Sequence, residues 1–299
     1  MCIRDSHYRV VAKAAKLCAE RLLYTLERDL FTAYRRFLPD PVKRDPHCIA
    51  KRAIAGALVD LDCNDVEFFI GGLAYRQLEP VWGGTVDTAV EIRCHCAMGL
   101  VATSYPRALQ EVLYLLSDPE ANARLGAVRA IACANPREAE LLLRLKVLSG
   151  DAEPEVIGEC FVGLLNVEPE ESLPFVAHYL FRAEAPIPEL SALALGESRL
   201  EEALEYLKQA WEVPPAGRNL RRILVRAAAL HRSDPAFDWL LAIAESAEPS
   251  LVEEILEALA LYKHNAELAQ RLEAMLAARD DPRLQGRFAR LWGDRQIPS

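Results

Sequence analysis

The chain has 299 residues, of which 52% are hydrophobic and 26% are charged, and its net charge is −9. These proportions are typical of a folded protein with a sizeable core, and they exclude disordered, collagen-like and low-complexity chains. The negative charge gives no general electrostatic attraction to nucleic acid or to an anionic membrane, so we expect neither as a partner. Eight cysteines with irregular spacing do not form a disulfide scaffold.

The first six residues differ in character from those that follow. Residues 1–6 resemble a translated adapter remnant, so we expect a non-native leader, and whether repeats are missing upstream of residue 7 stays open. From His7 the chain is amphipathic, with Lys13 and Lys16 where a signal peptide would be apolar. No apolar run approaches the roughly 20 residues that cross a bilayer. We therefore expect a cytoplasmic protein with reduced thiols.

Prolines recur in two interleaved series along most of the chain. One series falls at residues 106, 136, 169 and 235, and the other at residues 119, 154, 186, 215, 249 and 282. Proline fits the first turn of a helix, where its missing N–H has no partner within the helix. Each proline therefore predicts a helix start, and steps of about 30–35 residues within a series predict a repeated pair of helices.

Apolar residues between the prolines follow helical spacing, as do Val252, Ile255, Leu256 and Leu259. Because no Asn-Gly or Asp-Gly turn joins alternating β-branched runs, we expect no strands. A pair of short helices cannot bury its own apolar face, so neighbouring pairs must stack into a continuous core. We predict an all-α fold, a right-handed α-solenoid of about seventeen helices in antiparallel hairpins, forming one domain over residues 7–299.

Small residues recur in the segments expected to be second helices, of which the clearest are Leu125–Ala132, Ile223–Leu230 and Val10–Ala15. In these segments the sequence resembles the HEAT-repeat superfamily of bacterial type, over nearly the whole chain from about residue 7. The resemblance implies a concave surface lined by second helices, with Arg93, Arg129 and Arg226 as candidate groove residues. A tetratricopeptide array is the nearest alternative, whereas an armadillo array needs a third helix for which there is no room.

Residues 77–86 interrupt the repeat, and we expect an irregular loop there. Tryptophan, tyrosine and arginine dominate binding hot spots, and loops on a rigid scaffold often carry function. The predicted partner-binding residues are Tyr75, Arg76, Glu79, Trp82, Asp87, Arg93 and Arg129. One alternative stays open, in which Trp82 folds back as a plug while Arg76 pairs with Glu79 or Asp87 pairs with Arg93.

Patterns of catalytic or metal-binding residues are missing from the sequence. Cys94 and Cys96 would point about 200° apart on a helix, so both cannot bind one ion. The sequence has neither the His-Glu pairs of di-iron HEAT-repeat hydroxylases nor the glycine motifs of phosphate sites and hydrolases. We predict a non-catalytic scaffold or adaptor that binds a protein partner and uses no metal and no cofactor.

The charge is unevenly distributed along the chain. Residues 1–52 hold 12 basic and 6 acidic side chains, a balance of +6, and residues 53–217 hold 11 and 26, a balance of −15. The acidic stretch is either a solvated face or a surface that steers a basic partner. Two other functions stay open: a cofactor-handling enzyme resembling HEAT-like bilin lyases, and a nucleic-acid binder acting through the positive N-terminal end.

Overall fold

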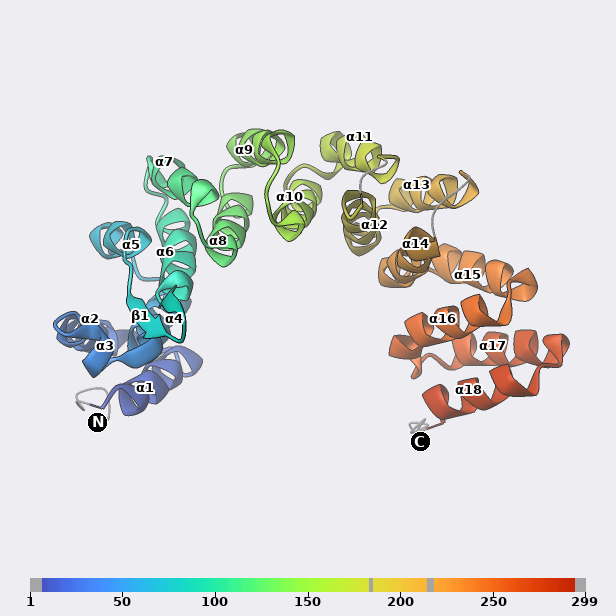
Figure 1. The fold of residues 1–299 in the computed structure, drawn as a ribbon, viewed down its shortest axis with the longest axis horizontal. Helices are drawn as coiled ribbons and strands as arrows, with labels where there is room; N and C mark the ends of the chain where they lie inside the picture. Colours follow the sequence, from blue (N-terminus) through green and yellow to red (C-terminus); the bar gives the residue numbers. More distant parts are fainter. Residues whose placement is uncertain (1–6, 183–184, 214–217, 294–299) are drawn as a thin grey trace. The chain divides into compact units, whose positions relative to one another are not determined.

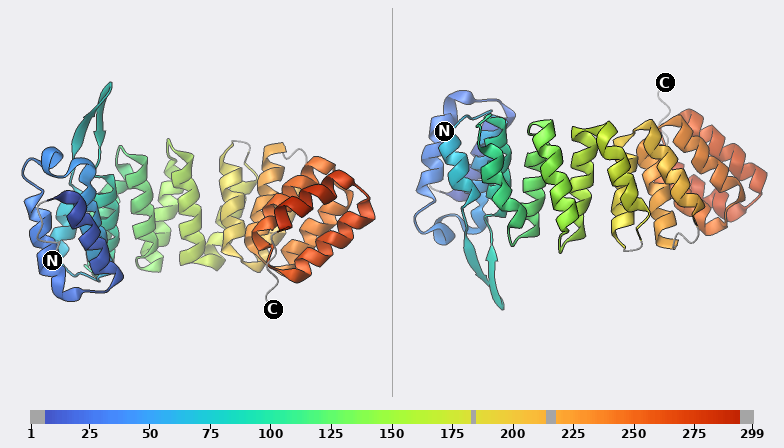
Figure 2. Two further views of the ribbon diagram at one scale, coloured as in Figure 1. Left: turned by 90° about the horizontal axis from the view of Figure 1, so that it is seen from below. Right: turned by 90° about the horizontal axis from the view of Figure 1, so that it is seen from above.

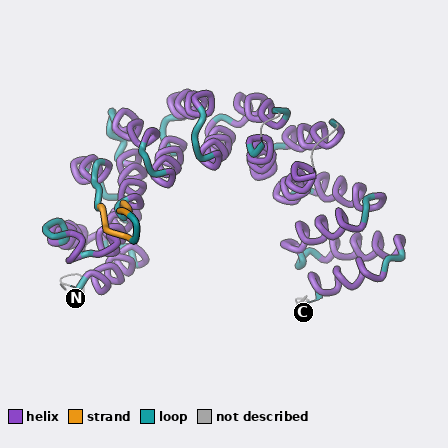
Figure 3. The backbone as a smooth tube through the Cα atoms, viewed as in Figure 1, coloured by secondary structure: helices purple, strands orange, loops and turns teal. Residues whose placement is uncertain are grey.

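The computed structural model describes residues 7–182, 185–213 and 218–293. The expected leader at residues 1–6 and the proline at 215 lie outside these residues. Contacts divide the chain into two compact units, residues 1–163 and residues 164–299. Helices make up almost all of the regular structure, and the two strands lie together in the first unit (Figure 3).

The first unit consists of short helices and a β-hairpin. Its helices are α1 (Tyr8–Glu20), α2 (Glu27–Arg36), α3 (Pro41–Arg44), α4 (Ile49–Asp60), α5 (Val66–Leu73), α6 (Val90–Ala102), α7 (Ala108–Val112), α8 (Ala121–Ala132) and α9 (Pro136–Ser149). The strands are β1 (Leu78–Val81) and β2 (Gly84–Asp87). Helix α10 (Pro154–Val167) runs across the boundary between the units.

Two layers of helices build the first unit. Helices α1, α4, α6 and α8 pack against one another in succession, and α2, α5 and α9 cover one side of this row (Figure 1). Each helix of the row therefore contacts its partner in the same hairpin and the equivalent helix of the next hairpin. Such nearest-neighbour packing is characteristic of a solenoid.

The second unit repeats this arrangement. Its helices are α11 (Pro169–Leu180), α12 (Ile187–Ser198), α13 (Glu201–Glu212), α14 (Arg218–His231), α15 (Asp234–Ser246), α16 (Pro249–Leu259), α17 (Ala266–Arg279) and α18 (Pro282–Trp292). Helices α12, α14, α16 and α18 form one row, while α11 packs on α13 and α15 packs on α17 in the other layer. The chain is thus an all-α solenoid of antiparallel hairpins, with eighteen α-helices among the described residues.

The core of the second unit confirms the helical spacing seen in the sequence. The side chains of Val252, Ile255, Leu256 and Leu259 are all fully buried in it. Complete burial of one such side chain stabilises the fold by about 1.5–3 kcal/mol. The rows also need small residues, because an ideal Cβ at Gly196 would lie 2.2 Å from the carbonyl oxygen of Ala227 on the next helix of the row.

Most of the proline series marks helix starts as expected. Helices α9, α10, α11, α16 and α18 begin at the predicted prolines, and α12 and α15 begin within one residue of them. The prolines at 106 and 119 are exceptions, because α7 and α8 begin two residues later. Among the described residues, every helix is too short or too polar to cross a membrane.

Candidate functional site

Residues 78–87 form a β-hairpin, so the expectation of an irregular loop without strands was wrong. The strands β1 and β2 pair antiparallel through a two-residue turn. Gly83 in this turn has φ 87°, a left-handed conformation that glycine adopts without strain. The turn residues are Trp82 and Gly83, and the signal in the sequence is a glycine at the second turn position between short extended runs.

The tip of the hairpin is exposed and uncharged. Trp82 is 103% exposed, so it does not fold back as a plug. Val81 and Val86 beside it are also exposed, and no charged residue occurs between Glu79 and Asp87. The hairpin extends beyond the ends of the neighbouring helices of its unit (Figure 2). It therefore presents a neutral apolar tip with a tryptophan at its end.

Glu79 fixes the base of the hairpin to the segment before α4. Its Oε1 accepts hydrogen bonds from the backbone N–H of His47 at 2.6 Å, from Gln77 Nε2 at 2.8 Å and from the Thr88 hydroxyl at 2.8 Å. Burial by itself would raise the pKa of Glu79, but these hydrogen bonds outweigh burial and lower the pKa below its usual value. Glu79 is buried and satisfied internally, so it is not open to a partner.

Tyr75 connects the hairpin base to a buried ion pair. Its hydroxyl donates to Gln77 Oε1 at 3.0 Å, and Gln77 Nε2 donates to the backbone oxygen of Asp45 at 3.0 Å. Lys51 Nζ lies 2.9 Å from Asp45 Oδ2, and both side chains are fully buried. Burial raises the pKa of Tyr75 above its usual value.

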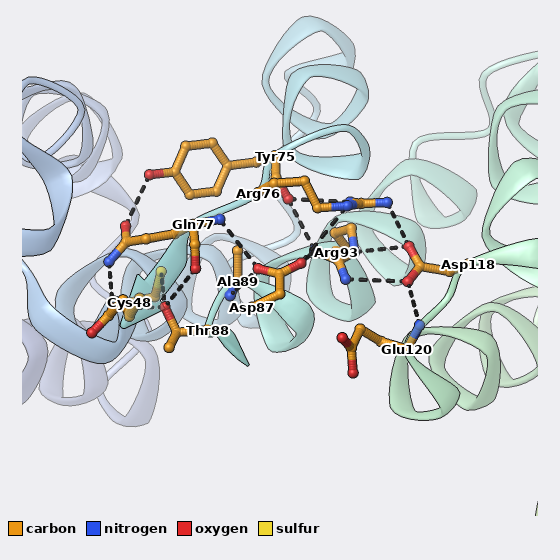
Figure 4. Close-up of polar contacts among 11 residues, drawn as sticks. Cys48, Tyr75, Arg76, Gln77, Asp87, Thr88, Ala89, Arg93, Asp118 and Glu120 are labelled. Atoms are coloured by element: carbon orange, nitrogen blue, oxygen red, sulfur yellow. Dashed lines mark hydrogen bonds and ion pairs between the residues drawn. The ribbon is translucent and has the colours of Figure 1, made fainter. Parts of the chain in front are cut away.

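Arg93 of α6 lies at the centre of a second buried cluster (Figure 4). Its Nη1 donates to Asp87 Oδ2 at 2.6 Å and to the Tyr75 carbonyl at 3.0 Å, and its Nε lies 3.1 Å from Asp118 Oδ2. Arg76 Nη2 reaches the same Asp118 oxygen at 2.6 Å. Because the Arg93 side chain is 0% exposed, it cannot line a groove, and the expectation that it faces a partner is corrected.

Asp87 ties the second strand to this cluster. Its Oδ1 accepts the backbone N–H groups of Gln77 at 3.1 Å and of Ala89 at 2.9 Å. Burial acts to raise the pKa of Asp87, but these hydrogen bonds and the one from Arg93 lower it overall. The Asp87–Arg93 pair considered as an alternative is therefore present, whereas Arg76 bonds to aspartates and not to Glu79.

These ion pairs follow a regular spacing of aspartates and cations in the sequence, which was not among the predictions. An aspartate is followed six residues later by a cation at Asp45 and Lys51, at Asp87 and Arg93, and at Asp118 and Arg124. Each aspartate lies just before a helix of the row α1, α4, α6 and α8, and each cation lies in the first turns of that helix. We call these three pairs, together with Asp151, the buried charge ladder.

The ladder connects successive hairpins. Arg93 bonds to Asp118 of the next hairpin, and Arg124 bonds to Asp151 of the one after through Nε at 2.9 Å and Nη2 at 2.7 Å. Burial would raise the pKa of Asp151, but the hydrogen bonds from Arg124 and Lys146 hold it at about 2. These carboxylates are all bonded to neighbouring groups, so the ladder serves to hold the hairpins together.

Arg129 and Arg226 belong to different units of the chain. Arg129, on α8, is largely exposed and makes a two-pronged ion pair with Glu159, at 2.8 and 2.9 Å. Arg226, on α14 of the second unit, lines a shallow groove of about 400 Å³ with Leu193 and Leu261. Within the first unit, the partner described for Arg129 is thus Glu159 of α10 and not a residue of the hairpin.

The predicted residues therefore separate into a tip and a base. Tyr75, Arg76, Asp87 and Arg93 meet at the base with Glu79 beside them, while Trp82 occupies the tip. Among the described residues, no three His, Cys, Asp or Glu side chains are placed to hold one metal ion. The groups at the base bond to one another, and the fully exposed part of the hairpin is its tip.

Comparison with known proteins gives a distant structural likeness. The sequence matches no family model and no curated protein. Among solved structures, the chain is similar to the complex of CpcE and CpcF of phycocyanin lyase from Nostoc sp. PCC7120. The TM-score is 0.36 and the identity 16%, with 77% of this chain and 88% of that chain covered. A likeness of this size assigns no role to any residue of the chain.

The comparison nevertheless contradicts one expectation from the sequence. The chain was expected to be non-catalytic, whereas the protein that it resembles is a lyase. We therefore withdraw the prediction that the chain is not an enzyme.

Proposed function

We propose that the chain binds a protein partner through the tip of the hairpin, with Trp82 as the anchor. The observation that carries this proposal is the complete exposure of Trp82 at the end of an ordered hairpin. A tryptophan buries more apolar surface on binding than almost any other side chain, and tryptophans are enriched among binding hot spots. A large apolar side chain that stays fully exposed favours aggregation. A partner that covers Trp82 therefore accounts for the exposed position of this side chain.

The buried base supports the proposal because it holds the hairpin in one orientation. Glu79 accepts three hydrogen bonds on one side of the base, and Asp87 accepts two N–H groups and an arginine on the other. A binding segment that is already ordered loses little conformational entropy when a partner docks. The base thus contributes to affinity by fixing the tip, although its own side chains are out of reach.

The repeat architecture supports a scaffold of HEAT type. The three segments on which the sequence resemblance rests lie in α1, α8 and α14. These helices belong to the row α1, α4, α6 and α8 of the first unit and to the row α12, α14, α16 and α18 of the second. Aspartates and cations recur six residues apart, and ion pairs join each hairpin to the next, from Arg93 to Asp118 and from Arg124 to Asp151. This recurrence fits stacked repeats of one kind. We therefore propose a HEAT-like assignment for the chain, with the hairpin inserted into one repeat.

A second function is the handling of a cofactor, as in HEAT-like bilin lyases. The sequence left this alternative open, and the lyase complex named above agrees with it better than with a purely structural role. Mixing the purified chain with a free bilin tests it directly. A shifted, intensified visible absorbance band that co-elutes with the protein would support chromophore handling, and an unchanged bilin spectrum would exclude it.

The partner proposal is tested with two exposed aromatic residues as a matched pair. Trp82→Ala removes the anchor, and Tyr114→Ala removes an exposed ring outside the hairpin, in the short 3-10 helix Leu113–Ser117. A photo-reactive residue at Val81 should cross-link one defined protein in the unchanged chain and in the Tyr114 variant. The same product should be lost with Trp82→Ala. If Trp82→Ala cross-links as well as the Tyr114 variant, the tip is not the binding site.

A further inference from the structure

The two outer edges of the hairpin differ in their free hydrogen-bonding groups. The backbone N–H of Thr88 donates to the Gln77 carbonyl, so Gln77 and Thr88 are a hydrogen-bonded pair. Pairs alternate along an antiparallel ladder, so Glu79 with Val86 is bonded and Pro80 with Thr85 is not. The backbone groups of Pro80 and Thr85 therefore point outward, away from the opposite strand.

Only the edge of β2 can accept another strand. Pro80 has no N–H, so the outer edge of β1 lacks the donor that an added strand needs. Thr85 keeps both its N–H and its C=O, and in the described part of the chain no other bond of that N–H is found. Gly84, Thr85 and Val86 are all exposed, so the edge is accessible.

We propose that the strand added to β2 is β2 of a second copy of this chain, so that two hairpins join into a four-stranded antiparallel sheet. This inference rests on the proposed function, because it names the partner of the same hairpin. A second copy carries what the edge requires: an exposed and unblocked strand whose one charged residue, Asp87, is paired with Arg93 of its own copy. The chain has a net charge of −9, so two copies repel elsewhere, whereas residues 80–86 carry no charge.

Centring the pair on Thr85 satisfies both edges. Thr85 of each copy then donates to and accepts from Thr85 of the other, as in any hydrogen-bonded antiparallel pair. Gly84 faces Val86 of the other copy on one face of the sheet, and the glycine leaves room for the valine side chain. In this register Trp82 of each copy lies across from Thr88 of the other, at the end of the paired strands.

The test compares two substitutions at Thr85 that leave the tip intact. Thr85→Pro removes the outward N–H and keeps the bonds inside the hairpin, while Thr85→Val keeps the N–H. Sedimentation velocity over a concentration series should show a monomer–dimer equilibrium for the unchanged chain and for Thr85→Val. Thr85→Pro removes one hydrogen bond from each copy, so its dissociation constant should rise roughly tenfold or more. The Thr85 amide should exchange hydrogen slowly only in the dimer.

Three outcomes would overturn the inference. The unchanged chain could remain a monomer at every concentration, a dimer could persist in Thr85→Pro, or the dimer could leave exchange at Thr85 fast. If a different protein cross-links to Val81 of a monomeric chain, the proposed function stands and the second copy is wrong. If a dimer forms through Thr85 but Trp82→Ala leaves it unchanged, strand pairing stands and the tryptophan anchor is wrong.

Discussion

Removing the guanidinium of Arg93 should destabilise the first unit strongly. Arg93→Met keeps most of the side-chain volume but leaves two buried carboxylates, those of Asp87 and Asp118, without their shared cation. Loss of one partner from a buried ion pair costs about 3–5 kcal/mol. Asp118 retains Arg76, and Asp87 retains two backbone N–H donors, so we expect the lower end, about 3 kcal/mol.

Arg76→Met is the matched control, because it removes a cation from the same Asp118 oxygen. The Arg76 side chain is 40% exposed, and exposed pairs contribute about 0–1 kcal/mol. Urea unfolding followed by circular dichroism gives both values from the shift in midpoint at an unchanged slope. Equal losses for the two variants, or a loss below about 1 kcal/mol for Arg93→Met, would refute the argument that burial makes the difference.

Two further predictions concern close packing and acid stability. Gly196→Ala should lower the melting temperature, since its Cβ would meet the Ala227 carbonyl and such overpacking costs about 1–3 kcal/mol. Gly286→Ala should raise the melting temperature, because no atom lies within 4 Å of its Cβ and alanine stabilises a helix by up to about 1 kcal/mol over glycine. The opposite order of the two melting temperatures would disprove the close approach at Gly196. The pKa of Asp151 is about 2 against 3.8 ordinarily: burial raises it, but the Arg124 hydrogen bond lowers it further. The contribution of Asp151 to the free energy of unfolding is therefore complete above about pH 4 and lost towards pH 2. Asp151→Asn should flatten the dependence of that free energy on pH across this range.

The solenoid could be predicted because its signals are local. Proline at 136, 154, 169, 249 and 282 sets the first turn of a helix whatever surrounds it. Spacing such as Val252 to Leu259 fixes one buried face of a helix, which then has to meet a neighbour. The prolines at 106 and 119 misplaced a helix start by two residues, because the chain makes a turn before the helix begins.

The candidate site could be predicted only in part, because exposure depends on tertiary contacts. Six residues close in sequence, together with Arg129, were expected to face a partner, but Arg93 and Glu79 are buried by the segments beside them. The sequence does not show which side of the hairpin faces the core, since both strands carry polar residues at their base and none at their tip. The role of Trp82 in binding stays a prediction, and its full exposure follows from a hairpin that was not expected.

The buried charge ladder has a consequence for how each of the two units unfolds. If the hairpin that holds Asp118 and Arg124 melted alone, Arg93 in the preceding hairpin and Asp151 in the following one would lose their bonds with it. In the second unit the ion pairs between hairpins, such as Arg222 with Glu254, are partly solvated and easily replaced by water. The first unit should accordingly melt in a single concerted step, while the second can fray hairpin by hairpin from its ends.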